Sequence, residues 1–402
     1  MNTSSQRPNP GSTSYLLPFW LGLFLFSIYL LSFSGKFHVM DELAVFAAGH
    51  NLAQHSRADI DQLIWTNHWT PNPPGVWGED GHLYTKKAPG ISFLAVPLIW
   101  LGHAVPGLNA VHVGLLTNAI VTALTAALLF SWLSELGFSR RTATLATLIY
   151  GLGTIAWVYA RMFWESSLLA LFFLVAIWAA YRATERRPAS RRYLWLLLSG
   201  LAIAVGLTLR FEAIVAFFLI GFYFWWQGLN SVNQPSANRV SFWRKFIASL
   251  PRLVIYALPT LLVALGLVGF NFARFGSLTE TGYTQELLFR APWVGGFGLL
   301  FSPGRGLFIF SPVMLLLFFG LRPAWRRLPR AYFWLIGAMC LFYWLFYGSW
   351  FAWGGTWGWG PRFLLPILPL LMLFVAEPLA WASQTDLPHR GGGAGRHDES
   401  HL

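Results

Sequence analysis

The chain has 402 residues, of which 55% are hydrophobic, 17% aromatic and only 11% charged. A water-soluble protein of this size needs more charged residues to cover its surface, and the mean hydropathy of +0.51 agrees, so the composition excludes a soluble or disordered protein and indicates a membrane protein. The single cysteine, Cys340, excludes an internal disulfide framework and a cysteine-based zinc site.

Long segments without Asp, Glu, Lys or Arg recur along the chain, and a helix needs about 20 residues to cross a bilayer. We therefore predict an all-α polytopic membrane protein with about 10 to 11 transmembrane helices, in a single domain over residues 15–382. The tails at 1–14 and 383–402 are expected to be cytoplasmic, and the second to be disordered because of its low complexity. The expected spans lie at about 15–33, 108–134, 142–160, 165–181, 193–209, 211–227, 251–271, 306–321, 331–348 and 363–382.

Basic residues gather between alternate spans, at 140–141, 182–192, 239–252 and 322–330. The positive-inside rule places these clusters in the cytoplasm and leaves the opposite side close to neutral, so the net charge of +12 reflects topology rather than nucleic-acid binding. The outer face then holds a first extracytoplasmic loop with its surface helices at 34–107, a second loop at 271–305 and a Trp-Gly turn at 348–361.

Residues 89–106 form an apolar segment that two prolines, Pro97 and Pro106, interrupt. We expect a helix that lies on the membrane surface there, because the start and the end of the neutral run that contains it must lie on opposite sides of the membrane. If this segment crosses the membrane instead, the chain has eleven spans, and half of the connecting segments lie on the opposite side of the membrane from the one predicted.

The first outer loop opens with Met40-Asp41-Glu42, directly after the first span. The apolar residues that follow share one helical face, which predicts a short amphipathic helix on the membrane surface. On spacing alone, Asp41 could simply be the N-cap of this helix, with Glu42 favoured by the helix dipole. Later in the loop comes Tyr84-x-Lys86-Lys87-x-Pro89-Gly90. Lysines at a membrane edge commonly act as anchors.

The same loop contains Asp59-x-Asp61, which mimics a metal-binding pair of aspartates, and several histidines. We expect no metal site, because one such pair is unsurprising in a long polar loop and the histidines lack the tight spacing and acidic partner that zinc favours. These histidines are His38, His50, His55, His68 and His82.

The other outer segments contain further motifs, namely Asn271-Phe272-Ala273-Arg274, Glu280-Thr281-Gly282-Tyr283, Ser302-Pro303-Gly304-Arg305, Trp353-Gly354-Gly355 and Gly360-Pro361-Arg362. Together with the acidic pair and the lysine segment of the first loop, this order resembles the polyprenyl-phosphate-sugar-dependent transferases of the GT-C fold. That group includes the protein O-mannosyltransferases and the lipid A aminoarabinose transferases. The resemblance extends from residue 15 to about residue 379.

The resemblance implies a glycosyltransferase of the cell membrane, transferring a hexose or pentose. It would move the sugar, with inversion, from a polyprenyl-phosphate donor to a glycan, lipid or protein acceptor at the extracytoplasmic face. It also implies that Asp41 is the general base beside Glu42, and that Lys86, next to Lys87, binds the donor phosphate. No cofactor is implied besides the lipid-linked sugar, and no divalent metal is expected.

Charged and aromatic residues at the outer edge of the spans complete the predicted site by topology, since edge charges are costly and guanidinium groups match phosphate oxygens. The alternatives are that Arg161 with Glu165 and Arg210 with Glu212 only form ion pairs that close hairpins, and that the tryptophans form an interfacial belt. The predicted phosphate-binding arginines are Arg161, Arg210, Arg305 and Arg362, and the predicted pocket residues are Tyr84, Glu165, Glu212, Tyr283 and Trp353.

Other function classes stay open at this point. A transporter would favour internal repeats and polar groups at the bilayer midplane, whereas this chain keeps its midplanes apolar. A lipid-head-group transferase or a flippase accessory would share a cationic outer pocket but would not need Asp41. An O-antigen ligase or polymerase is the closest enzymatic rival, although a large late loop is expected there and the longest loop here comes first.

Overall fold

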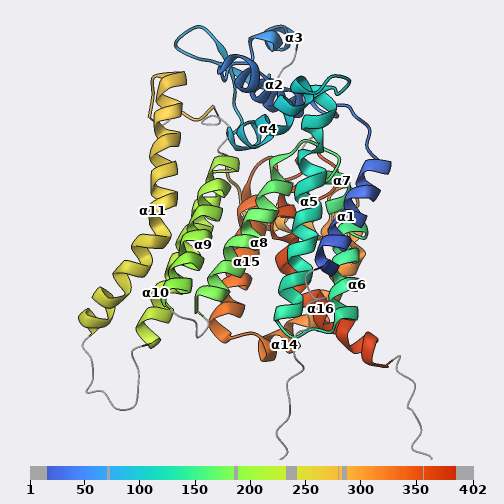
Figure 1. Cartoon of the computed structure of the whole chain (residues 1–402), viewed down its shortest axis with the longest axis vertical. Helices are drawn as coiled ribbons and strands as arrows, with labels where there is room; N and C mark the ends of the chain where they lie inside the picture. The colour runs from blue at the N-terminus through green and yellow to red at the C-terminus, as the bar shows by residue number, and fades with distance from the viewer. Residues whose placement is uncertain are drawn as a thin grey trace, which may run out of the picture.

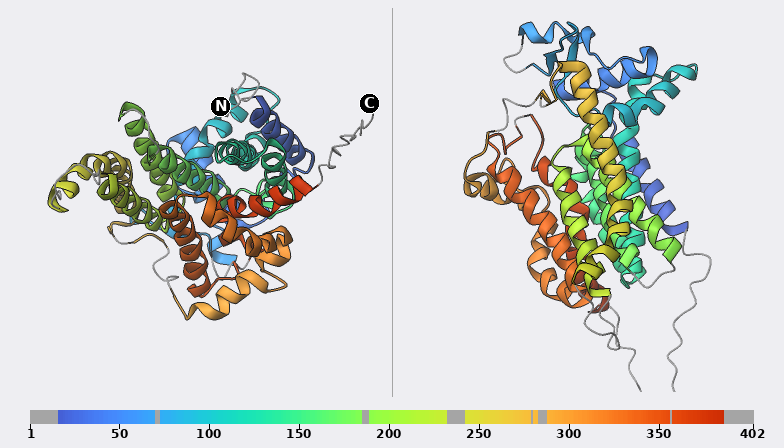
Figure 2. Two further views of the ribbon diagram at one scale, coloured as in Figure 1. Left: turned by 90° about the horizontal axis from the view of Figure 1, so that it is seen from below. Right: turned by 90° about the vertical axis from the view of Figure 1, so that its left-hand side faces the viewer.

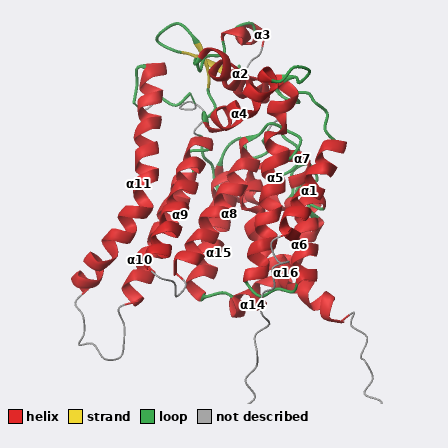
Figure 3. Cartoon of the chain, in the orientation of Figure 1, coloured by secondary structure: helices red, strands yellow, loops and turns green. Residues whose placement is uncertain are grey.

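The computed structural model describes residues 16–69, 73–184, 189–231, 242–278, 280–282, 288–355 and 357–385 (Figure 1). These residues form helices and one small two-stranded hairpin (Figure 3). The α-helices are α1 Leu16–Leu31, α2 Met40–His55, α3 Thr66–Trp69, α4 Gly90–Ala104, α5 Ala110–Glu135, α6 Arg140–Leu152, α7 Ala156–Tyr159, α8 Glu165–Thr184, α9 Ala189–Leu209, α10 Ala213–Ser231, α11 Phe242–Phe275, α12 Pro292–Phe301, α13 Leu307–Phe310, α14 Leu317–Arg327, α15 Arg330–Ser349 and α16 Leu368–Thr385. The strands are β1 Gly75–Trp77 and β2 Leu83–Thr85, and 3₁₀ helices cover Asp61–Leu63, Pro312–Leu316 and Arg362–Ile367.

Among the described residues, six helical segments are long and apolar enough to cross a membrane. They are Ala110–Glu135, Glu165–Thr184, Arg191–Leu209, Ile247–Phe275, Arg330–Ser349 and Arg362–Ala382. Shorter apolar helices lie at Leu16–Leu31, Gly90–Ala104, Ala213–Leu229 and Pro292–Phe301. The prediction of an all-α polytopic membrane protein is therefore confirmed.

Two of the predicted spans are not continuous helices. In the segment 142–160, α6 ends at Leu152 and α7 begins only at Ala156. The span predicted at 306–321 is wrong as a single helix, because α13 ends before Pro312, which has no N–H to continue a helix. The two breaks meet, since the N–H of Ile155 donates a hydrogen bond to Oγ of Ser311 at 3.2 Å. Apolar composition could not reveal these breaks.

The loop predicted at 34–107 forms a cap over one end of the helical bundle. In Figure 1, α2, α3, α4 and the hairpin lie at the upper end, whereas the α5–α6 turn and α14 lie at the lower end. The segment 89–106 contains α4, which packs against α2 and α5 in this cap. The described basic clusters at 140–141 and 322–330 lie at the opposite end, as the charge pattern predicted.

Close backbone contacts fix the position of the cap. The Oγ of Ser92 in α4 donates to the carbonyl of Val45 in α2 at 2.7 Å, and a Cβ on Gly49 would lie only 2.9 Å from the Ser92 carbonyl. A Cβ on Gly90 would overlap the backbone of Thr208 in α9. The chain between β2 and α4, which carries both lysines, is therefore held above the end of α9.

The hairpin is held to α2 by a small apolar cluster of its own. Strands β1 and β2 are antiparallel, and Val76 pairs with Tyr84. The cluster consists of Ala44, Ala47, Ala48, Ile60, Leu63 and Leu83.

Helix α11 stands at the edge of the bundle, where it packs against α9 and α10 (Figure 2). Its end is attached to the first loop, because the carbonyl of Arg274 accepts a hydrogen bond from the N–H of Glu79 at 3.0 Å. In return, Nη1 of Arg274 donates to the carbonyl of Thr85 at 3.2 Å. These two hydrogen bonds thus connect the cap to α11 at the edge of the bundle.

Candidate active site

Asp41 lies in the first turn of α2 and points toward the lysine segment of the same loop. Its Oδ2 is 2.9 Å from Nζ of Lys87. The residue before the helix, Val39, makes no side-chain cap, and Asp41 lies inside the helix, so the interpretation of Asp41 as an N-cap is wrong. Burial by itself would raise the pKa of Asp41, but Lys87, Arg362 and Lys86 together outweigh it and lower that pKa. Asp41 is therefore a carboxylate at neutral pH.

The two lysines follow β2 directly, and the hairpin fixes their backbone. The N–H of Lys86 donates to the carbonyl of Pro74 at 3.2 Å, and the N–H of Lys87 donates to Oγ1 of Thr85 at 3.2 Å. Lys86 is buried, with 7% of its surface exposed. Nζ of Lys87 lies 5.7 Å from the centre of the Trp164 ring, in the range of a cation–π contact.

Arg362, at the start of the 3₁₀ helix Arg362–Ile367, lies beside the same tryptophan as Lys87. Its guanidinium carbon lies 4.2 Å from the centre of the Trp164 ring and 4.7 Å from that of Phe363. The side chain is buried, and neither Nε nor Nη1 has a hydrogen-bond partner among the described residues. The turn before it packs closely on this side chain, because a Cβ on Gly358 would lie 2.5 Å from its Cδ. An unsatisfied buried guanidinium is costly, so its retention points to a ligand.

Arg210 is held by two carboxylates that come from different hairpins. Its Nη1 donates to Oε1 of Glu165 at 2.7 Å, and its Nε to Oε1 of Glu212 at 2.5 Å. The hydroxyl of Tyr347 also donates to Glu212, and its ring stacks on Phe363 at 4.4 Å between centroids. This buried network connects α8, α10 and α15 and keeps the guanidinium in one orientation.

A single cavity brings most of these groups together. Its wall is largely apolar, with leucines and aromatic rings from α9, α11 and α15, and its charged groups lie at the end covered by the cap. The lining residues are Lys86, Lys87, Ala88, Pro89, Glu165, Leu207, Leu209, Arg210, Phe211, Glu212, Leu267, Asn271, Arg274, Thr281, Phe289, Phe346, Tyr347, Trp350, Arg362 and Phe363.

Some of the predicted site residues do not line this cavity, and Asp41 is one of them, since it contacts the lining only through Lys87. Tyr84 donates its hydroxyl to Asp80 at 2.6 Å, and Nη1 of Arg161 donates to the carbonyl of Ser32 at 2.9 Å rather than to Glu165. The guanidinium of Arg305 donates to the carbonyl of Gly358 in the Trp-Gly turn. Trp353 packs on the glycines of α12, and Tyr283 lies outside the described residues.

The sequence interpretation did not assign a role to two residues that take part in the site. Arg274 is buried, lines the cavity and donates to Oδ1 of Asn271 at 2.6 Å. Trp164 lies beneath both Lys87 and Arg362. The Asn271-to-Arg274 motif contained the signal for the first of them, whereas nothing in the sequence distinguished Trp164 from the other tryptophans.

Glu42 does not face the cavity, although it follows Asp41 in the chain. Its side chain is fully buried, and Oε2 accepts a hydrogen bond from the N–H of His38 at 2.7 Å. Burial raises the pKa of Glu42 to about 7, against the opposing effect of backbone donors that include His38. Glu42 therefore attaches the start of α2 to the preceding segment.

We expect Glu42→Gln to flatten the pH dependence of thermal stability. The folded protein holds this proton more tightly than the unfolded chain, so the contribution of Glu42 falls as pH rises from 4.5 to about 7 and is constant above. His38 acts in the opposite sense, because burial, Arg161 and Lys36 lower its pKa. Melting curves of both proteins from pH 5 to 8 measure the difference, and parallel curves would contradict the prediction.

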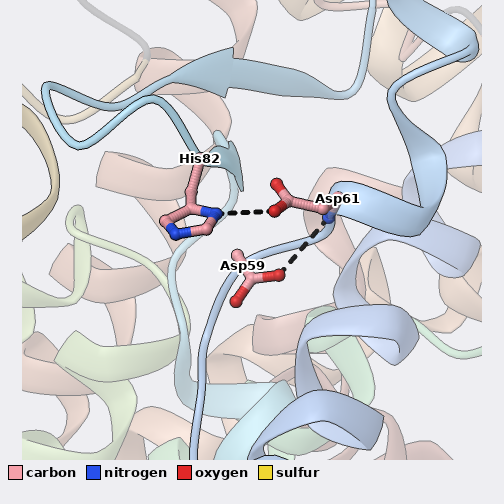
Figure 4. Close-up of side chains that lie close together, drawn as sticks. All are labelled: Asp59, Asp61 and His82. Carbon is pink, nitrogen blue, oxygen red and sulfur yellow. Dashed lines mark hydrogen bonds and ion pairs between the residues drawn. The ribbon is translucent and has the colours of Figure 1, made fainter.

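A second polar cluster lies beside strand β2 of the hairpin (Figure 4). Ligand atoms of Asp59, Asp61 and His82 lie within 4.8 Å of one another, and Nδ1 of His82 is 2.6 Å from Oδ2 of Asp61. His82 thus has the acidic partner that the sequence interpretation did not find. These three could ligate a metal ion, but Arg57 already pairs with Asp59 at 2.7 Å and with Asp61 at 3.5 Å. None of the three lines the cavity.

Comparisons with known proteins agree with this architecture. The family model for dolichyl-phosphate-mannose-protein mannosyltransferase matches residues 102–272. ArnT from Cupriavidus metallidurans in the apo state has a TM-score of 0.57 at 16% identity, covering 92% of this chain and 61% of that protein. The chain has the GT-C fold. The resemblance inferred from the motifs is thereby confirmed.

Two further structures with the GT-C fold contain lipid phosphates. ArnT from Cupriavidus metallidurans bound to undecaprenyl phosphate has a TM-score of 0.53 at 15% identity, covering 93% of this chain and 62% of that protein. The archaeal oligosaccharyltransferase AglB from Archaeoglobus fulgidus, in complex with an inhibitory peptide and a dolichol-phosphate, has a TM-score of 0.55 at 12% identity, covering 94% and 51%. The chain thus spans only 51% to 62% of the length of these proteins. No curated protein matches it in sequence.

Proposed function

We propose that the chain is a membrane glycosyltransferase that moves a sugar from a polyprenyl-phosphate donor to an acceptor hydroxyl or amine, with inversion. The observation that carries this proposal is the cavity in which Lys86, Lys87 and Arg362 meet beside an apolar wall. A lipid phosphate combines these two properties, because its headgroup is anionic and its chain is apolar. The lipid phosphates in the structures of ArnT and AglB support the same ligand class.

The basic residues of the cavity contribute to phosphate binding in different ways. Arg362 offers Nε and Nη1, which are unpartnered among the described residues, and guanidinium forks bind phosphate oxygens in bidentate fashion. Lys86 and Lys87 add positive charge from the cap. Arg210 already pairs with Glu165 and Glu212. It therefore contributes positive electrostatic potential and the shape of the cavity more than a direct bond to the phosphate. These charges stabilise the phosphate as it leaves.

Asp41 supplies the base for the transfer. The acceptor oxygen or nitrogen attacks the anomeric carbon from the side opposite the phosphate, a new bond forms there, and the carbon–oxygen bond to the phosphate breaks with its electron pair leaving on the phosphate. The acceptor proton passes to the Asp41 carboxylate. Lys87 contacts Asp41 and also lines the cavity. It therefore holds the proposed base next to the proposed phosphate site.

The reaction is assigned to the extracytoplasmic face of the cell membrane. The support is the charge pattern: the described basic clusters at 140–141 and 322–330 lie at the end of the bundle opposite the cap. The acceptor would be a glycan, a lipid or a protein that reaches the cap from outside. A lipid-linked sugar is the co-substrate, and the proposed mechanism assigns no role to a metal.

A transfer assay tests this proposal. Membranes that contain the protein are incubated with polyprenyl-phosphate carrying radiolabelled mannose, glucose or aminoarabinose, and the label is followed from the lipid to other membrane components. One donor is expected to lose its label faster than in matched membranes without the protein. Equal loss of every label in both preparations would overturn the proposal.

A further inference from the structure

A second groove lies at the opposite end of the bundle from the proposed active site. It runs between α14 and α16, near the lower end in Figure 1. Its residues are Phe318, Phe319, Arg322, Pro323, Arg326, Arg327, Glu377 and Trp381, and we call it the α14 groove. The two helices meet closely here, because a Cβ on Gly320 would overlap the carbonyl of Phe374. The groove is therefore built into the packing of the fold.

The charge of the α14 groove is only partly neutralised. Glu377 is its one lining acid, and its two carboxylate oxygens accept from Arg327, at 2.6 and 3.4 Å. Arg322 and Arg326 form no ion pair with any residue that the structure describes. Both side chains are exposed, and a guanidinium group without an acidic partner among the described residues can bind the oxygens of an anionic ligand.

Apolar side chains lie beside these arginines. Phe318 and Phe319 are 64% and 62% exposed, and Trp381 is 52% exposed. The face of α14 therefore changes along its length, because Phe318, Arg322 and Arg326 follow one another at intervals of four residues. Rings stand at the beginning of the helix and guanidinium groups at its end. This order matches a lipid, with acyl chains at one end and an anionic headgroup at the other.

We propose that the α14 groove binds an anionic phospholipid, with its phosphate between Arg322 and Arg326 and its acyl chains against Phe318 and Phe319. This site is independent of the proposed transfer reaction, because it shares no residue with the other cavity. General attraction of basic ends to anionic membranes is the competing explanation. Arg140 and Arg141 provide the comparison, since they are exposed at the same end and do not line the groove.

Native mass spectrometry of the full-length protein tests the proposal. The purified protein is titrated with phosphatidylglycerol, and separately with phosphatidylcholine of the same chain length, and the bound lipid is counted. The wild type should retain phosphatidylglycerol in preference. The double variant Arg322→Gln with Arg326→Gln should bind it roughly 25-fold more weakly, since each basic side chain near an anionic lipid contributes a factor of about five.

The control is the double variant Arg140→Gln with Arg141→Gln, which removes the same charge from the same end. It should retain phosphatidylglycerol as the wild type does. Equal weakening in both double variants would show that binding follows net charge, and equal retention of phosphatidylcholine by the wild type would show that the headgroup charge is not recognised. Either result overturns the proposal.

Discussion

Asp41→Asn should lower the rate of sugar transfer by roughly 10²- to 10⁴-fold, while the affinity for the donor is unchanged or slightly higher. Asn keeps the shape of the side chain but cannot accept the acceptor proton. Its neutral charge also removes a negative group near the place proposed for the donor phosphate, where Lys87 touches Asp41 at 2.9 Å. Initial rates at varied donor concentration separate kcat from KM and so measure the two effects.

Asp80→Asn is the matched control, because Asp80 is an exposed acid of the same loop that accepts from Tyr84, whereas Asp41 contacts Lys87 of the cavity lining. Its activity should stay within a few-fold of wild type. If Asp41→Asn kept near-normal transfer at an unchanged melting temperature, Asp41 would only hold Lys87 in place and the proposed base would be wrong.

The general architecture could be predicted from the sequence because each membrane span is a local pattern of residues. Uncharged segments of sufficient length predict helices that cross, and the positions of Lys and Arg predict which ends lie together. Pro312 shows the limit of this reasoning: a proline within an apolar segment can be tolerated or can end the helix, and the contact between Ile155 and Ser311 that accompanies the break joins residues far apart in the chain.

The candidate site was predictable where a motif or an edge charge marked it, as for Asp41, Lys86 and Arg362. Their convergence depends on helix packing, which no local pattern contains. Arg210 was predicted to bind phosphate, with an ion pair to Glu212 as the alternative. It forms that pair and also pairs with Glu165 from the preceding hairpin, which the alternative had matched with Arg161. Glu42 was placed beside Asp41 as a catalytic group, although neighbours in a helix point in different directions.

Arg362→Gln is expected to weaken donor binding by roughly 10- to 100-fold, because hydrogen bonds to a charged group contribute about 1.5–3 kcal/mol. The thermal stability of the protein without donor should be unchanged or higher. Nε and Nη1 of Arg362 have no hydrogen-bond partner among the described residues, so the folded protein bears a desolvation cost that the neutral side chain reduces. Such a loss of function without loss of stability is typical of a residue kept for a ligand.

Arg161→Gln should give the opposite pattern and is therefore the control. Arg161 also has an unpartnered Nε among the described residues, but its Nη1 donates to the carbonyl of Ser32 at 2.9 Å and it does not line the cavity. Its loss should therefore lower the melting temperature and leave donor affinity nearly unchanged. Calorimetry measures the donor affinity of both variants, and melting curves measure their thermal stability.

Arg362→Lys refines the result: if the fork geometry of the guanidinium matters as well as its charge, this variant should keep only part of the wild-type donor affinity. A lower melting temperature with unchanged donor affinity in Arg362→Gln would instead assign Arg362 to the packing of the turn against Trp164, and the phosphate site would have to be sought among the lysines alone.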